Sequence, residues 1–350
     1  MSAILKRWNI KIFLVFVALS LTSVQYHRVR HIVLQGPHPE YKVNSYLSLT
    51  NGLKCFRDNV PYFHRARVIA CYHSSMICKA FGLKHSNKQP ATYADVIALD
   101  YCVWVFAMFV VIIVLSKKPF MLIVGTVAAM QYSFMPMSEG QVSPWDMPSL
   151  FWWFLVLLIN ETKYKKSIIY LIPIGALYKE IIVVLSILIL FWNDQPIKRR
   201  VILFFIVSGI GIGLKMVQGI VGGCSVLGNQ SFRYDYNPIH KSHACRTGET
   251  YIFVRNLHSM FWWSNFNPIW FSIGGLWLGI ILLPLPAKFR VIAAVYFFTV
   301  FIPGNITEGR LWHELIPVFF VGYESYKKKK MRPEIIKHLT KYENKMWLTK

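Results

Sequence analysis

Acidic side chains are scarce in this sequence. Among its 350 residues only 16 are Asp or Glu, against 39 Lys or Arg, and charged residues of both signs make up 16% of the chain. A typical soluble domain holds about 25% charged residues, so the composition disfavours a soluble protein. Linkers rich in proline, serine or glycine and low-complexity tracts are also missing, which leaves no boundary at which to divide the chain. We therefore predict a single integral-membrane domain over residues 1–350.

Motifs for nucleic-acid binding are missing as well, although the formal net charge is +23. The chain has no zinc-finger spacing of Cys and His, no RNP-like motif and no basic helix with groove-reading side chains. The Lys and Arg residues lie instead between apolar runs and in the C-terminal tail. Anionic lipid headgroups attract such clusters, and the cytoplasmic loops of membrane proteins are enriched in them. We predict membrane lipids as partners and no nucleic acid.

Apolar residues dominate what is present. Hydrophobic residues make up 55% of the chain and aromatic residues 16%, and the mean hydropathy is +0.40. Several apolar runs approach or exceed the roughly 17 residues that a helix needs to cross a bilayer. The sequence predicts an all-α fold, a polytopic transmembrane helix bundle with about 8–10 membrane segments. Besides the segment discussed next, the expected spans are 12–24, 93–115, 119–134, 148–159, 201–221, 260–283, 291–302 and 311–323.

The segment 167–192 allows two interpretations. As one crossing, it would place the basic cluster at 198–200 outside. As two half-length helices, it enters and returns with Lys179 and Glu180 at the turn, and each half is ~18 Å long, too short for a ~30 Å hydrocarbon core. With the hairpin, every connection assigned to the cytoplasmic side carries a Lys/Arg cluster. We therefore predict a broken hairpin, a multi-pass protein with both termini cytoplasmic, and a basic cytoplasmic tail over 327–350.

The connection over 27–92 is expected to be an extracytoplasmic loop with a helix of its own. Charged residues lie among apolar ones in 62–81, which predicts an amphipathic helix in the membrane interface. The loop is basic, an exception that the charge rule allows for long loops. The apolar residues near helical spacing are Val68, Ile69, Tyr72, Met76, Ile77 and Phe81.

Glycines crowd the span 201–221. Gly209 and Gly213 have the small-xxx-small spacing that lets another helix approach, so we expect them to pack. Lys215 lies deep in the same span and requires a counter-charge, for which Glu180 is a candidate.

Charged residues at the edges of apolar runs are the candidate functional groups, because a charge inside a membrane segment costs at least ~2.5 kcal/mol on insertion scales. Asp146, with Glu139 before it, opens a span in the stretch Pro-Trp-Asp-Met-Pro over 144–148. It is either the N-cap of the helix that follows or a functional carboxylate, and the two roles are compatible. Lys179 and Glu180 form either an ion pair that closes a buried turn or part of a hydrophilic cavity. Both clusters fall on the predicted outer side.

A third cluster opens the last expected span with Glu308, Arg310, His313 and Glu314. Arg310 and Glu314 are four residues apart and share a helix face. A guanidinium suits bidentate contact with phosphate or carboxylate, although an interfacial ion pair is the simpler alternative. His313 and Glu314 do not form the zinc motif, which needs a second His, so no metal ligand is assigned.

Three stretches carry a resemblance to polytopic proteins of bacterial surface-polysaccharide synthesis. They are Pro-Trp-Asp-Met-Pro over 144–148, Leu-Tyr-Lys-Glu over 177–180, and Glu-Gly-Arg followed by Glu-Leu-Ile-Pro over 308–317. The layout is similar to the GT-C glycosyltransferase superfamily. The resemblance implies transfer of a sugar from a polyprenyl-phosphate donor on the extracytoplasmic face of a bacterial inner membrane. The sequence departs from that pattern after the first span, where the loop offers only Glu40 and Asp58 rather than paired acids.

Such a glycosyltransferase or polymerase needs a carboxylate to take the proton of the acceptor hydroxyl and cations to neutralise the leaving phosphate. The candidates are Asp58 or Asp146 as base, Lys179, Arg310 and His313 as phosphate ligands, and Glu180 and Glu308 as positioning groups or ligands of a divalent cation.

Two other functions remain open. Half-helices with charges near mid-membrane are typical of transporters, so a transporter or flippase for a lipid-linked or anionic substrate is one alternative. No inverted repeat is evident between the halves of the chain, which disfavours it. A non-catalytic scaffold in a synthesis complex is the other. The sequence specifies neither the sugar, the lipid carrier nor the oligomeric state.

Overall fold

The structure is a computed structural model, in which every described element is a helix. The prediction of an all-helical fold is therefore confirmed for these residues, and no strand occurs among them. The described residues are 2–35, 48–54, 67–82, 90–116, 119–133, 145–222, 281–282, 284–301 and 313–327.

Three of the described helices contain segments long and apolar enough to cross a membrane, namely Ile10–Leu34, Ala94–Leu115 and Ile197–Val221. They belong to α1 (Ser2–Gln35), α6 (Pro90–Leu115) and α11 (Ile197–Val221). Shorter helices stand where other spans were expected: α7 (Pro119–Ser133), α8 (Asp146–Asn160), α14 (Ala287–Phe301) and a helix over 315–327. The expected span 260–283 lies almost entirely outside the described residues.

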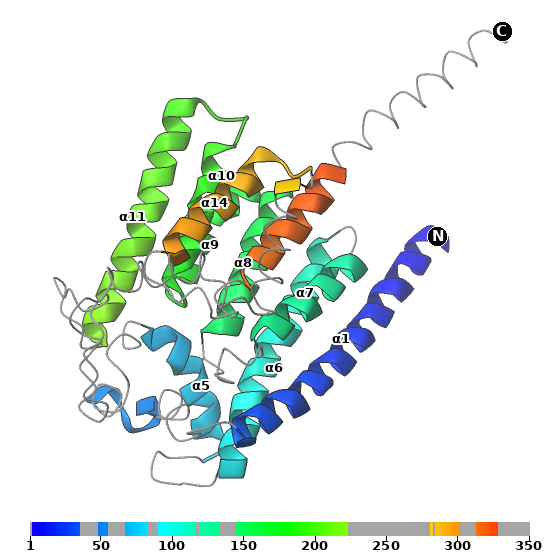
Figure 1. Ribbon diagram of the computed structural model, residues 1–350, viewed down its shortest axis with the longest axis vertical. Coiled ribbons are helices and arrows are strands. Elements are labelled where there is room, and N and C mark those ends of the chain that lie inside the picture. The colour runs from blue at the N-terminus through cyan, green and yellow to red at the C-terminus, as the bar shows by residue number, and fades with distance from the viewer. Residues whose placement is uncertain are drawn as a thin grey trace, which may run out of the picture.

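Helices α1 and α6 pack side by side along the edge of the bundle (Figure 1). Asp95 of α6 accepts hydrogen bonds from Tyr26 (2.8 Å) and Arg30 (2.5 Å) of α1. These contacts explain why α1 continues to Gln35, where we expected a loop from residue 27 onward. The polar residues after the apolar run find a partner on α6, and no Gly or Pro interrupts the chain until Gly36 and Pro37 follow the last helical residue.

The segment 167–192 is broken, as predicted. A short 3-10 helix η3 (Lys165–Ser167) leads into α9 (Ile168–Ala176), and η4 (Glu180–Ser186) leads into α10 (Ile187–Leu190). The two halves return to the same end of the bundle, because Lys165 and Asp194 meet there at 2.6 Å. Between the halves, Lys179 has an extended backbone (φ −150°, ψ 128°) and forms the tip of the hairpin.

Helix α11 packs along both halves of this hairpin (Figure 1). A Cβ on Gly211 would lie 3.0 Å from Val183 and 3.6 Å from Ala176, so this glycine is the point of close approach. We expected Gly209 and Gly213 to pack instead, and within the described chain that is wrong. A Cβ on either would meet no atom within 4 Å, because both lie on the outward side of α11.

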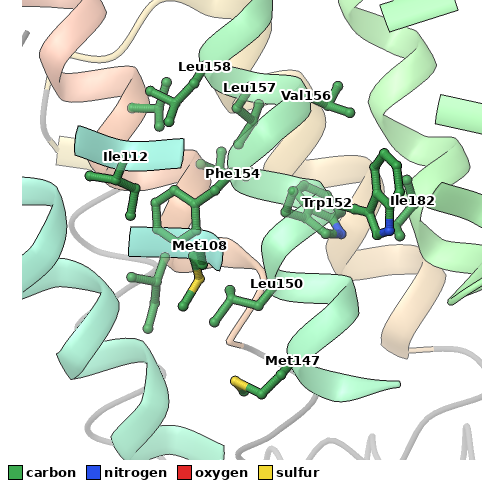
Figure 2. Packing of buried hydrophobic residues seen from close by; sticks show 14 of the residues in the cluster. Met108, Ile112, Met147, Leu150, Trp152, Phe154, Val156, Leu157, Leu158 and Ile182 are labelled. Atoms are coloured by element: carbon green, nitrogen blue, oxygen red, sulfur yellow. The ribbon is translucent and has the colours of Figure 1, made fainter. Parts of the chain in front are cut away.

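The core is built around α8. Figure 2 shows Phe154 facing Met108 and Ile112 of α6, while Trp152 lies on the other side, towards Ile182 of the hairpin. Met108, Ile112, Phe154 and Ile182 are at most 1% exposed. Helix α8 therefore connects α6 to the hairpin and fixes where the hairpin tip lies.

Helix α5 (Val68–Ala80) forms where the interfacial helix was expected, but it is shorter than 62–81. Residues 67 and 68 follow a stretch outside the described residues, and the helix contacts η1 (Ser48–Asn51) and α6. Its buried side consists mostly of small residues, and the large apolar Tyr72 and Met76 point outward. Only part of the apolar stripe seen in the sequence packs on the protein: Val68 and Ile77 face inward, whereas Tyr72 and Met76 do not.

Candidate functional site

The tip of the hairpin brings together charged side chains that are far apart in the sequence. The Lys179 ammonium donates a hydrogen bond to Glu314 Oε1 at 2.6 Å and lies 3.6 Å from Asp146 Oδ1. The side chains of Lys179 and Glu314 are 7% and 0% exposed. Breaking such a buried pair would leave an uncompensated charge, so it holds the tip in place.

Glu314 is the centre of this buried network. Its Oε1 also accepts a hydrogen bond from Ser149 of α8 at 2.9 Å, and its Oε2 accepts one from Tyr296 of α14 at 2.7 Å. His313 Nε2 lies 3.4 Å from Oε1. The carboxylate therefore ties α8, α14 and the start of the last helix to the hairpin tip.

Glu180 turns away from this network towards α5 and α11. Arg67 donates two hydrogen bonds to its carboxylate, from Nε (3.3 Å) and from Nη2, and Lys215 Nζ lies 3.5 Å from Oε2. The Arg67 guanidinium also lies over the Trp145 ring, 4.6 Å from its centroid. The Glu180 side chain is 52% exposed, so this second cluster is accessible to solvent, whereas the network around Glu314 is buried.

The hairpin tip separates Lys179 from Glu180 and brings Glu180 to Lys215. An ion pair between Lys179 and Glu180 is wrong, because the extended backbone at Lys179 sends the adjacent side chains to opposite sides. A counter-charge for Lys215 from Glu180 is confirmed.

A histidine–aspartate pair lies beside the tip. His73 Nδ1 of α5 is 2.9 Å from Asp100 Oδ1 of α6, and Ser74 Oγ donates to Asp100 Oδ2 at 2.5 Å. The imidazole stacks on Tyr178, with ring centroids 5.9 Å apart, and meets Trp104 edge-on at 5.1 Å. Since Tyr178 precedes Lys179, the pair adjoins both charged clusters.

The structure revises the roles expected of Asp146. The helix begins at this residue, with Trp145 as the N-cap and no side-chain capping hydrogen bond, so the capping role is wrong. Pro148 falls within the first turn, where its missing N–H leaves no hydrogen bond unmade. Asp146 is instead a buried partner of Lys179.

The remaining predicted site residues divide into two groups. Lys179 and His313 are buried against Glu314, so neither presents a free surface to a phosphate. Asp58, Glu308 and Arg310 lie outside the described residues. Within the described part of the chain no three His, Cys, Asp or Glu side chains gather to hold a metal ion, and the divalent cation stays a prediction.

Arg67, His73 and Asp100 were missed in the sequence. The signal for Asp100 was present, because it is an ionisable residue inside the apolar run 93–115 and such residues mark functional or buried partners. His73 and Arg67 gave no such signal, since they lie in a polar connection where His and Arg are ordinary.

Comparison of the chain with protein-family models, with curated proteins and with solved structures found no match.

Proposed function

We propose that the chain is a multi-pass membrane enzyme that transfers a sugar from a polyprenyl-phosphate carrier on the extracytoplasmic face, in the manner that the GT-C resemblance implies. The observation that carries the proposal is the meeting of a His–Asp pair and a two-cation cluster at the tip of a broken hairpin. Transfer from a lipid phosphate needs both a base and cations at one place.

The arrangement of the bundle supports the proposed sidedness. The connections with predicted cytoplasmic Lys and Arg meet at the end opposite the tip, where Glu161 binds both Lys288 and Ser325. The hairpin tip would then face the extracytoplasmic side, where a lipid-linked sugar is presented. Helix α5 would lie in that interface with Tyr72 and Met76 towards the lipid.

The base in this proposal is His73 rather than Asp58 or Asp146. Asp100 accepts the Nδ1 proton, which leaves Nε2 as the basic nitrogen of the neutral ring. Nε2 is buried and has no hydrogen-bond partner among the described residues, so a substrate would have to open the tip to reach it. An acceptor hydroxyl placed there would lose its proton to His73, while Asp100 stabilises the imidazolium that forms.

The proposal is tested by incubating membranes that contain the chain with a panel of radiolabelled polyprenyl-phosphate hexoses and measuring product and released carrier. Because a positioned base contributes about 10²–10⁴-fold, His73→Asn should lower the rate by at least about 100-fold. His31→Asn, a change at an exposed histidine of α1, is the matched control and should leave the rate unchanged. Absence of transfer from every donor, or full activity in His73→Asn, would overturn the proposal.

A transporter is the second candidate, because a hairpin broken inside an apolar segment is a transporter feature. Reconstitution in liposomes separates the two functions. An enzyme yields a new glycosidic product on one side of the membrane, whereas a transporter moves the unchanged lipid-linked sugar to the other leaflet.

A further inference from the structure

Lys215 carries a buried positive charge that has, among the described residues, a single carboxylate partner, Glu180. Its side chain is 13% exposed, and its closest carboxylate oxygen, Glu180 Oε2, lies 3.5 Å away. Within the described part of the chain its Nζ atom makes no hydrogen bond. An ammonium group offers three donors, and burying such a charge beside a single acceptor at 3.5 Å leaves donors unsatisfied, which is unfavourable. The position therefore suits an additional acceptor group.

A second cation shares the same carboxylate. Arg67 directs Nε and Nη2 at Glu180, and its guanidinium lies over the Trp145 ring, 4.6 Å from the centroid. Among the described residues, these two cations face one carboxylate, which balances one of the two positive charges. A fixed guanidinium beside an ammonium is the combination that recognises phosphate, since the first binds two oxygens at once and the second adds a point charge.

Glu180 is the one member of this cluster that is half exposed. Its carboxylate occupies the position from which an anion would contact both cations. We infer that Arg67 and Lys215 form a binding site for a phosphate or diphosphate group, and that Glu180 fills this site in the free protein and is displaced by the ligand.

The phosphate belongs either to a lipid carrier or to a free anion. The outward side of α11 next to Lys215 bears the exposed apolar side chains of Ile212 and Met216, against which a polyprenyl chain would pack. The inference does not require the transfer reaction proposed above, because it concerns binding alone.

The experiment measures binding to the purified full chain in neutral detergent by calorimetry, with inorganic pyrophosphate and farnesyl diphosphate as probes. Lys215→Met and Arg67→Gln should each weaken binding at least about tenfold, since each removes a charge-assisted contact. Lys165→Met removes a cation at the opposite end of the hairpin and should have no effect. Glu180→Gln removes the competing carboxylate and should strengthen binding about tenfold.

The gain in Glu180→Gln distinguishes a binding site from a folding defect, because misfolding does not raise affinity. Thermal unfolding of each variant, with and without pyrophosphate, checks that the fold is kept. A stronger response to farnesyl diphosphate than to pyrophosphate identifies a lipid-linked phosphate, and an equal response identifies a free one.

The inference is overturned if neither probe binds the wild type or Glu180→Gln, if Lys215→Met binds as tightly as Lys165→Met, or if Glu180→Gln binds no more tightly than wild type. Binding with these mutational effects but without sugar transfer would keep the anion site and reject the enzyme. Sugar transfer without these mutational effects on binding would keep the enzyme and reject the anion site.

Discussion

The two ends of the hairpin hold their charges differently. At the open end, Lys165 and Asp194 pair at 2.6 Å with side chains that are 29% and 43% exposed. At the tip, Lys179 and Glu314 pair at the same distance with side chains that are 7% and 0% exposed. Geometry is thus alike at both ends, and burial is what separates them.

Burial changes what each pair does. An exposed pair contributes little because water screens it, whereas a buried charge that loses its partner is strongly destabilising. The tip is therefore where the fold and the proposed site depend on single residues, and the open end is where substitutions are tolerated.

The largest expected effect is at the tip. Lys179→Met removes the ammonium that pairs with the buried carboxylates of Glu314 and Asp146, and should lower the free energy of unfolding by about 3–5 kcal/mol. Thermal or denaturant-induced unfolding in detergent measures it, with Lys165→Met as the matched control. The double variant Lys179→Met/Glu314→Gln should recover part of the loss because it removes one unpaired charge. Equal losses of unfolding free energy in Lys179→Met and Lys165→Met would show that burial does not determine how much each ion pair contributes to stability.

The second prediction concerns how α11 supports the hairpin. Gly211→Leu would overpack against Val183 and Ala176 and should cost about 1–3 kcal/mol. Gly209→Leu and Gly213→Leu, at positions open to the outside, should change stability much less. Unfolding of the three variants side by side tests the packing, and a loss at position 209 as large as that at 211 would contradict it.

The break in the hairpin and the pairing of Glu180 with Lys215 could be predicted from the sequence, but the partners of Lys179 could not. Opposite charges at 179 and 180 inside an apolar run mark a place where the chain cannot continue through lipid. Because Lys179 and Glu180 are adjacent and opposite in charge, we considered a pair between them. Their actual directions depend on the extended backbone at Lys179, which sends neighbouring side chains to opposite sides.

Helix α5 shows a second limit. In the sequence Tyr72 and Met76 belong to the apolar stripe of this helix, yet they are exposed, and small residues such as Ala70 face inward where they allow α5 to lie close to α6. That arrangement brings His73 to Asp100. Contacts between a polar connection and a distant span depend on how the helices pack, and this packing cannot be predicted from a single sequence. The ends of α1 and α8 were misjudged for a related reason, since Asp95 and Lys179 stabilise polar residues that were expected to lie outside a helix or at its cap.

An intermediate effect is expected where α1 meets α6. Asp95→Asn weakens the hydrogen bonds that Asp95 accepts from Tyr26 and Arg30. Because the Arg30 and Asp95 side chains are about half exposed, the change should lower the free energy of unfolding by only about 1 kcal/mol. The Arg30–Asp95 pair is about as exposed as the pair at the open end of the hairpin, so the effect should exceed that at the open end only because Asp95 accepts a second hydrogen bond, from Tyr26. Unfolding measurements should place this variant between Lys179→Met and Lys165→Met, and a loss as large as that of Lys179→Met would break the ordering by burial.

The smallest effect is expected at the open end, where it should depend on pH. The hydrogen bond from Lys165 holds the pKa of the Asp194 carboxyl below its usual range. A carboxyl whose pKa is lower in the folded state stabilises the fold above its unfolded pKa, and this contribution disappears as the pH falls through the folded value. Wild type should therefore be slightly more stable than Asp194→Asn at neutral pH, and the difference in melting temperature should vanish on acidification below the usual range of an Asp. Because the pair is exposed, salt should reduce the same difference. A difference that persists in acid and in high salt would mean that Asp194 acts through buried contacts, as the residues at the tip do.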